Sequence, residues 1–159
     1  MVKNLRAGCR PAHICSIKLI TDMSPKQIAL IQNSWRSLRG LDPHLVGDLF
    51  YSKLFLDHPE VRAMFPKDMS KQYQDLIGKF NIVIARLHQF EDLKSDIAAL
   101  ARRHIAYGVT PQHYAYVGAA LLWTLERGLG DDWTPPVAEA WQTCYALLSA
   151  TMLQSSENQ

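Results

Sequence analysis

His104 is the residue of this sequence best placed to do chemistry. It lies near the end of a helix predicted over residues 92–104, one turn after the apolar Leu100 and Ala101, so the three share a helix face. A polar ring on an otherwise buried face needs a partner, because an unsatisfied buried polar group is costly. That partner is a protein acceptor or a metal ion, and the pattern alone favours a hydrogen-bonded core histidine.

A second helix face pairs a polar side chain with an apolar one. Gln72 and Leu76 are four residues apart in a helix predicted to begin at about residue 70, and this spacing places them on one face. The carboxylates Asp75, Glu91 and Glu126 fall on faces expected to be solvated, so the sequence offers no acid pair for general acid–base catalysis. It also lacks the Gly-x-Ser-x-Gly motif of a serine nucleophile.

The three cysteines do not have the spacing of a metal site. Cys9 and Cys15 flank His13, but zinc would need a second closely spaced ligand pair, which the sequence lacks. An odd number of thiols fits a reducing compartment better than secretion, so we expect a cytoplasmic protein.

Length and composition predict one globular domain. The chain has 159 residues, of which 48% are hydrophobic and 20% charged, and its net charge is +2. A chain of this length buries enough surface to fold without a disulfide or metal staple. The small net charge and the lack of a long run of Lys or Arg argue against a nucleic-acid partner.

The first 22 residues are basic and contain no acid before Asp22. Ser16 and Lys18 interrupt the apolar stretch near residues 14–20, which is too short and too polar for a signal peptide or a membrane span. We expect a disordered extension, or a start codon assigned too early, because Met23 directly precedes a helix start. A weak targeting segment is the alternative. The expected organisation is an extension over 1–22, one domain over 23–154 and a tail over 155–159.

Helix signals run through the rest of the chain, and no segment alternates apolar and polar residues as a half-buried strand does. Ser24 and Gln27 can form a capping box, with Pro25 at the first helical position. The predicted helices span about 24–40, 43–56, 61–65, 70–87, 92–104, 111–129 and 134–153. We therefore predict an all-α domain of six to eight helices.

From Met23 to about Leu153 the sequence resembles the bacterial single-domain globins, the Vitreoscilla type of haemoglobin and the globin half of flavohaemoglobins. The matching stretches are Phe50-Tyr51-Ser52-Lys53-Leu54-Phe55, His58-Pro59-Glu60-Val61-Arg62, Met64-Phe65, Arg102-Arg103-His104, Tyr107-Gly108-Val109, His113-Tyr114, Val117-Gly118 and Ala140-Trp141. The part from Arg103 to Gly118 is specific, because it keeps the family's order and spacing. The resemblance implies a globin fold, whose helices pack in pairs at roughly 50° around haem.

The resemblance also implies roles for individual residues. His104 matches the proximal ligand of haem b (iron protoporphyrin IX), with Nε2 on the iron and the other ring nitrogen donating to a carbonyl one turn back, that of Leu100. Phe65 matches the aromatic residue packed flat on the porphyrin, Tyr51 the distal tyrosine and Gln72 the polar residue of the distal helix. The implied cofactor contacts are His104, Phe65, Leu76, Val109, Tyr51, Gln72, Val117 and Trp141, with His104 as the metal ligand.

The distal position of Gln72 depends on where the alignment is gapped. Gln72 lies 32 residues before His104 (104 minus 72), which is the family separation if the loop after Phe65 is three residues shorter here. Another placement of the gap would bring Asp75 and Lys79 into the pocket. Two buried charges over a ligand would carry a large desolvation cost, so we prefer Gln72.

The function implied by the resemblance is reversible binding of O2, NO or CO by ferrous haem, for oxygen storage, delivery or sensing. Hydrogen bonds from Tyr51 and Gln72 would make O2 binding tight and its release slow. The alternative is an NO dioxygenase that detoxifies nitric oxide with a separate flavin and NADH reductase, for which Tyr51, Gln72 and Tyr114 are the catalytic candidates. A monomer or a homodimer is expected.

One feature of the sequence argues against the NO dioxygenase, and another argues against a third possibility, a globin without haem. Relatives carry a proximal His–Tyr–Glu network, in which Tyr114 matches the tyrosine. Ser156 stands at the position of the glutamate and Glu157 follows it, a shift of about 100° around a helix, which puts strong dioxygenase or peroxidase-like chemistry in doubt. A haem-free globin used as an interaction module would be expected to replace the proximal histidine, and His104 is present.

Overall fold

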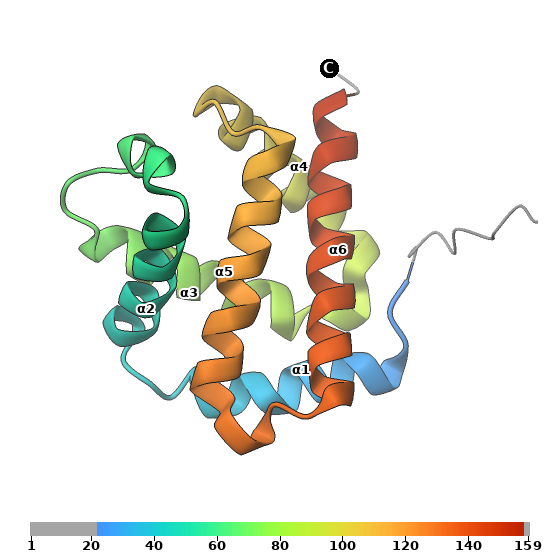
Figure 1. The fold of residues 1–159 in the computed structure, drawn as a ribbon. Helices are drawn as coiled ribbons and strands as arrows, with labels where there is room; N and C mark the ends of the chain where they lie inside the picture. The colour runs from blue at the N-terminus through green and yellow to red at the C-terminus, as the bar shows by residue number, and fades with distance from the viewer. Residues whose placement is uncertain (1–21, 158–159) are drawn as a thin grey trace, which may run out of the picture.

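The computed structural model describes residues 22–157 of the chain. Within that range the chain forms six α-helices and three short 3-10 helices, and it contains no strand (Figure 1). In chain order these are α1 (Pro25–Leu38), α2 (Pro43–Asp57), η1 (Pro59–Met64), α3 (Ser70–Ala85), η2 (Leu87–Gln89), α4 (Phe90–Ala106), α5 (Pro111–Leu129), η3 (Gly130–Asp132) and α6 (Pro135–Glu157). The predicted all-α fold class is confirmed.

Polar caps and prolines start the helices where the sequence predicts them. At the start of α1, Ser24 Oγ accepts a hydrogen bond from the N–H of Gln27 at 3.2 Å, and the Gln27 side chain accepts one from the N–H of Ser24 at 3.0 Å. This is the predicted capping box. At the start of α2, Asp42 Oδ1 accepts from the N–H of His44 at 2.9 Å. Proline fits the first turn of both helices because an N–H there has no helical partner.

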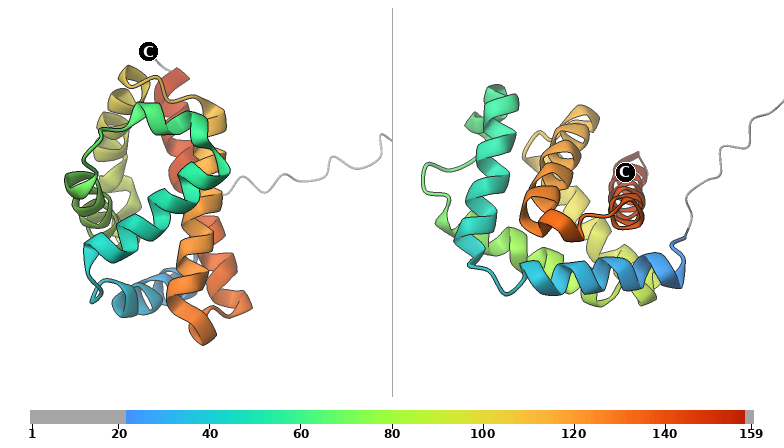
Figure 2. Two further views of the ribbon diagram at one scale, coloured as in Figure 1. Left: turned by 60° about the vertical axis from the view of Figure 1, so that its left-hand side comes forward. Right: turned by 60° about the horizontal axis from the view of Figure 1, so that its bottom comes forward.

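Helices α5 and α6 form the centre of the helix packing, with α2 on α5 and both α1 and α4 on α6. Figure 1 shows α5 and α6 standing side by side with α1 across their lower ends, and Figure 1 and the right-hand view of Figure 2 place α5 between α2 and α6. Helix α3 packs chiefly on α2, whereas α4 packs chiefly on α6. The helices that carry Gln72 and His104 therefore pack on different neighbours.

The buried apolar residues form two clusters. The main cluster draws on α1, α2, α3, α5 and α6. The smaller cluster consists of Leu93, Ile97, Ala101, Tyr114 and Met152. Three partly buried side chains, those of Val83, Phe90 and Leu148, pack against both clusters and mark where they meet.

Several helix ends differ from the predictions by two residues or more, and two of these have a local explanation. Helix α4 begins at Phe90 rather than residue 92, and its N-cap residue Gln89 makes no side-chain capping hydrogen bond. Helix α6 continues to Glu157, beyond the expected end near Leu153. The hydroxyls of Ser155 and Ser156 donate to the carbonyls of Thr151 and Met152 at 2.8 and 2.9 Å, a bond that lets serine stay within a helix.

The predicted extension over 1–22 lies outside the described residues, apart from Asp22. In the part of the chain that the structure describes, no helix combines the length and apolar character needed to cross a bilayer.

Candidate ligand-binding site

His104 holds its ring in one defined tautomer near the end of α4. Its Nδ1 lies 2.9 Å from the carbonyl oxygen of Leu100, and because a carbonyl can only accept, Nδ1 carries the hydrogen. This is the hydrogen bond predicted from the resemblance. Nε2 then presents a lone pair, and it has no hydrogen-bond partner among the side chains described, those of residues 22–156. Burial lowers the pKa of His104, against the opposing effect of the bond to Leu100, so the ring is a neutral donor to a metal.

Tyr51 and Gln72 form a second polar group, contributed by α2 and α3. Gln72 Nε2 donates to the Tyr51 hydroxyl oxygen at 3.0 Å. Burial raises the pKa of Tyr51 to about 12, with the hydrogen bond from Gln72 as a smaller opposing effect, so the phenol keeps its hydrogen. That hydrogen has no acceptor within the described part of the chain. The pair can therefore offer an O–H donor, held in place by an amide, to a ligand beside it.

A glycine allows the two helices of this pair to approach each other. A Cβ added at Gly47 in α2 would lie 2.5 Å from Cβ of Tyr73 in α3, so only glycine fits this crossing without displacement. The Tyr73 ring stacks on Tyr51, with centroids 5.7 Å apart and an interplanar angle of 29°. Its hydroxyl turns the other way and donates to Asp48 Oδ1 at 3.2 Å. Tyr73 thus supports the Tyr51 ring without joining its hydrogen bond.

An aromatic wall stands beside the same pair. The ring centroids of Phe65 and Tyr51 are 5.3 Å apart, and those of Phe65 and Phe55 are also 5.3 Å apart. Phe65 and Leu76 are only partly buried, although both pack against the main cluster. Each of these large apolar side chains therefore keeps part of its surface exposed, where an apolar ligand could contact it.

The side chains at His104 suit a metal that is already coordinated by a cofactor and needs one protein ligand. Among the described residues, no group of three or more His, Cys, Asp or Glu side chains could hold a metal ion. A single neutral imidazole is too few donors for a bare ion, but it is the proximal ligand that an iron porphyrin takes. The side chains Leu76, Val83, Leu100, Val109 and Val117 are apolar and only partly buried, which is the kind of side chain that the apolar faces of such a macrocycle would contact. The residues present therefore fit haem.

The residues predicted on the proximal side are only partly brought together. The Tyr114 ring stacks near His104, with centroids 6.2 Å apart and an angle of 19°, and Val109 packs on the smaller cluster with its N–H donating to the His104 carbonyl at 3.0 Å. Ser156 donates to Met152 within its own helix and not to Tyr114. The structure thus places Tyr114 beside the imidazole without linking it to Ser156.

Trp141 lies in the main cluster, and Val117 packs against that cluster. Trp141 is 1% exposed, its indole N–H donates to Ser34 Oγ at 3.0 Å, and its ring lies 6.1 Å from that of Trp35. These contacts place Trp141 between α1 and α6, apart from the Tyr51–Gln72 pair. Val117 is partly buried on the edge of the same cluster.

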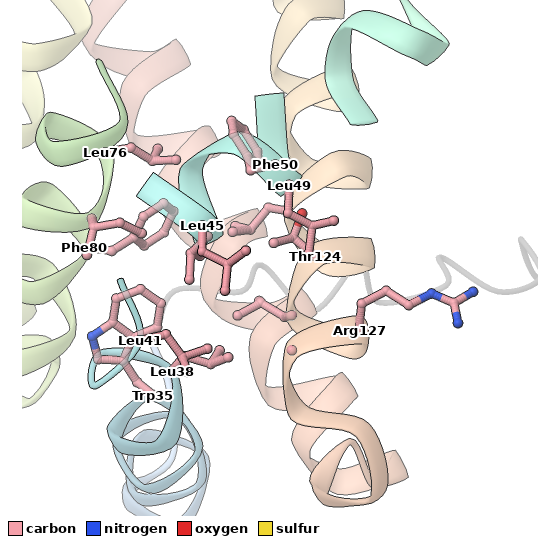
Figure 3. Close-up of a pocket in the computed structure, with 15 residues that line it drawn as sticks. Trp35, Leu38, Leu41, Leu45, Leu49, Phe50, Leu76, Phe80, Thr124 and Arg127 are labelled. Carbon is pink, nitrogen blue, oxygen red and sulfur yellow. The ribbon is translucent and has the colours of Figure 1, made fainter. Parts of the chain in front are cut away.

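A separate cavity of about 230 Å³ lies among α1, α2, α3 and α5 (Figure 3). Its apolar lining includes Trp35, Leu38, Leu45, Leu49, Phe50, Leu76 and Phe80. The two polar side chains of the lining do not converge on it: the Thr124 hydroxyl donates to the Ala120 carbonyl at 2.8 Å, and the Arg127 guanidinium points away (Figure 3). His104 does not line this cavity. The polar chemistry of the protein therefore lies elsewhere, at His104 and at the Tyr51–Gln72 pair.

Sequence reasoning missed two residues that shape the site. Tyr73 directly follows Gln72 and so lies about 100° around the helix from it, which gave no sign that it supports Tyr51. Arg62 belongs to a matching stretch, but nothing in the sequence indicated its contacts with the loop after η1, described below. For Tyr73 the sequence did contain a signal, Gly47, because a glycine within a helix often marks a close approach of another segment.

The comparisons with known proteins agree on one family. A family model described as globin matches residues 48–152. A neuroglobin of Chaenocephalus aceratus is 32% identical over 147 residues, covering 83% of this chain and 91% of that protein. A flavohemoprotein of Bacillus subtilis is 31% identical over 103 residues, covering 63% of this chain and 26% of that protein.

Similarity in structure agrees with similarity in sequence. The bacterial globin from Campylobacter jejuni shares the fold with a TM-score of 0.74 at 22% identity, covering 85% of this chain and 97% of that one. The predicted membership among bacterial single-domain globins stays a prediction, because neuroglobins and flavohemoproteins both match. At the level of the family the prediction is confirmed, and the chain belongs to the globin family.

Proposed function

We propose that this globin binds haem b through Nε2 of His104 and reversibly binds O2, NO and CO beside Tyr51 and Gln72. Family membership implies the haem. The observation that carries the proposal is the Tyr51 hydroxyl, which accepts from Gln72 at 3.0 Å and keeps its own hydrogen for a further acceptor. Oxygen storage, delivery or sensing is the role that fits these residues.

The side chains of this globin would orient the cofactor and stabilise a polar gas ligand. Haem supplies, when bound, the iron position at which a diatomic gas binds. The bond from His104 Nδ1 to Leu100 holds the imidazole plane, so that Nε2 presents its lone pair in a fixed direction. Tyr51 donates to a ligand that accumulates negative charge, and such a hydrogen bond contributes about 1.5–3 kcal/mol. Phe65 and Leu76 would exclude water from that hydrogen bond.

Turnover of NO is the second candidate, favoured by the match to flavohemoproteins. The residues that would act are the same Tyr51 and Gln72, which would hold O2 while NO reacts with it. Such a cycle needs an electron donor, which this proposal assigns to a separate flavin and NADH reductase.

Oxygen uptake and NO consumption separate the two functions. We expect the purified, haem-loaded protein to bind and release O2 over repeated cycles of gas exchange. Without a reductase, we expect NO to be removed once per haem and no further, because renewed binding of O2 would need an electron. With NADH and a reductase added, we expect no sustained removal of NO above that of the reductase alone. Sustained catalytic removal of NO, above that of the reductase alone, would assign the protein to the dioxygenases instead.

A further inference from the structure

Arg62 holds the loop that joins η1 to α3. Its Nη1 donates to the carbonyl oxygens of Phe65 and Pro66 at 3.1 and 3.0 Å, and its Nη2 lies 3.4 Å from the carbonyl of Lys67. The N–H of Phe65 donates back to the Arg62 carbonyl at 3.2 Å. The backbone of Phe65 is therefore fixed at both its N–H and its carbonyl by one residue.

The same guanidinium touches the aromatic wall of the site. Its central carbon lies 5.2 Å from the centre of the Phe55 ring, within the range of a cation–π contact. Phe55 in turn packs on Phe65 and on Tyr51, with centroids 5.3 and 5.8 Å away. Arg62 thus contacts the backbone of Phe65 and the ring that supports Phe65 and Tyr51.

Arginine suits this position better than lysine. Three successive carbonyls past the end of the 3-10 helix accept from one side chain, and Pro66 has no N–H with which to form a turn of its own. A guanidinium offers five donors in a planar fork and a flat face for stacking, whereas an ammonium is a compact point charge. Among the described residues no carboxylate pairs with Arg62, so its bonds to the loop are not secondary to an ion pair.

The loop also leads into the helix that carries Gln72. After Lys67, the Asp68 carboxylate accepts from the N–H of Ser70 at 2.9 Å, the first residue of α3. A shift of the carbonyls that Arg62 holds would therefore move both Phe65 and the start of α3. Gln72 lies within the first turn of that helix.

We propose that Arg62 is a positioning residue for the gas-binding site: through three loop carbonyls and Phe55 it fixes where Phe65 stands over the cofactor and where α3 begins. The proposal rests on the function proposed above, because it assigns Phe65 and Gln72 to that site. Arg62 itself does not touch the ligand.

Two substitutions and a matched control test it in the full-length, haem-loaded protein. Arg62→Gln removes the charge and most donors, and Arg62→Lys keeps the charge without the fork. The control is Arg86→Gln, which removes a guanidinium bonded only to the exposed Asp96 at 3.1 Å. The measurements are the rate of haem transfer to excess haem-free myoglobin and the width of the infrared stretching band of bound CO.

We expect haem transfer about tenfold faster in Arg62→Gln, as the loss of two or three modest hydrogen bonds predicts. The CO band should broaden, because Phe65 and Gln72 would sample more positions. Arg62→Lys should restore less than half of either effect, and Arg86→Gln should match the parent. The CO band makes the test specific, since a general loss of stability would not alter the surroundings of the bound gas.

Three results would overturn the proposal: a parent-like transfer rate and CO band in Arg62→Gln, full restoration by Arg62→Lys, or an equal effect of Arg86→Gln. If Arg62→Gln does not fold, Arg62→Lys alone decides. A parent-like transfer rate and CO band in Arg62→Lys would then show that the planar guanidinium is not needed. Failure of the proposed function looks different, because the parent protein itself would then hold no haem.

Discussion

Replacing His104 with alanine is expected to lower haem affinity by more than about 100-fold. Loss of a residue that only hydrogen-bonds to a metal ligand already lowers metal affinity by roughly 10–100-fold, and His104 is the ligand itself. The imidazole is the only ligand to the iron that the proposal draws from the protein, so no other side chain would compensate. The change should show as fast haem transfer to a scavenger protein and as an altered absorption spectrum.

Two controls separate ligation from folding. Imidazole added to His104→Gly should restore the parent spectrum, because the small molecule can take the place of the missing ring. His88→Ala removes an exposed histidine near the start of α4 and should leave haem transfer unchanged. A His104→Ala protein that keeps the parent's haem affinity would show that the axial bond is not there.

Tyr51→Phe should speed the dissociation of O2 by about 10–100-fold, the equivalent of one hydrogen bond to a charged acceptor. The ring stays, so its packing on Phe65 and Tyr73 is kept, and only the hydroxyl is lost. Dissociation of CO should change much less, because CO is a weaker acceptor. Stopped-flow displacement of O2 by CO measures the first rate, and displacement of CO by NO the second.

Tyr73→Phe is the matched control for this prediction. Tyr73 stacks on Tyr51, but its hydroxyl donates to Asp48 at 3.2 Å, so its removal should leave the O2 dissociation rate within twofold. Equal rates in Tyr51→Phe and the parent, or an equal rise in both variants, would mean that the Tyr51 hydroxyl does not contact the ligand.

The fold was predictable because its signals are local. Capping residues and prolines mark the starts of α1 and α2, and apolar residues at helical spacing mark their lengths. The start of α4 at Phe90 was missed because no side chain caps it. The end of α6 was missed because serine is a poor helix former in isolation, whereas here Ser155 and Ser156 bond to carbonyls of the preceding turn.

The site was less predictable, because its parts depend on packing between helices. Helical spacing placed His104 on an apolar face, but it favoured a core histidine, and only the resemblance to globins pointed to iron. The contacts of Arg62 go to backbone carbonyls. Every residue has such a carbonyl, so the residue types do not show which ones Arg62 contacts. The support of Tyr51 by Tyr73 follows from the α2–α3 crossing at Gly47, which is set in three dimensions.

One measurement tests the central claim most directly: the absorption spectrum of the purified, haem-loaded protein in its ferric, ferrous and ferrous–CO forms. Iron ligated by His104 predicts three distinct spectra, each different from that of free haem in the same buffer. Spectra that match free haem in all three states would contradict the assignment of His104 as the iron ligand.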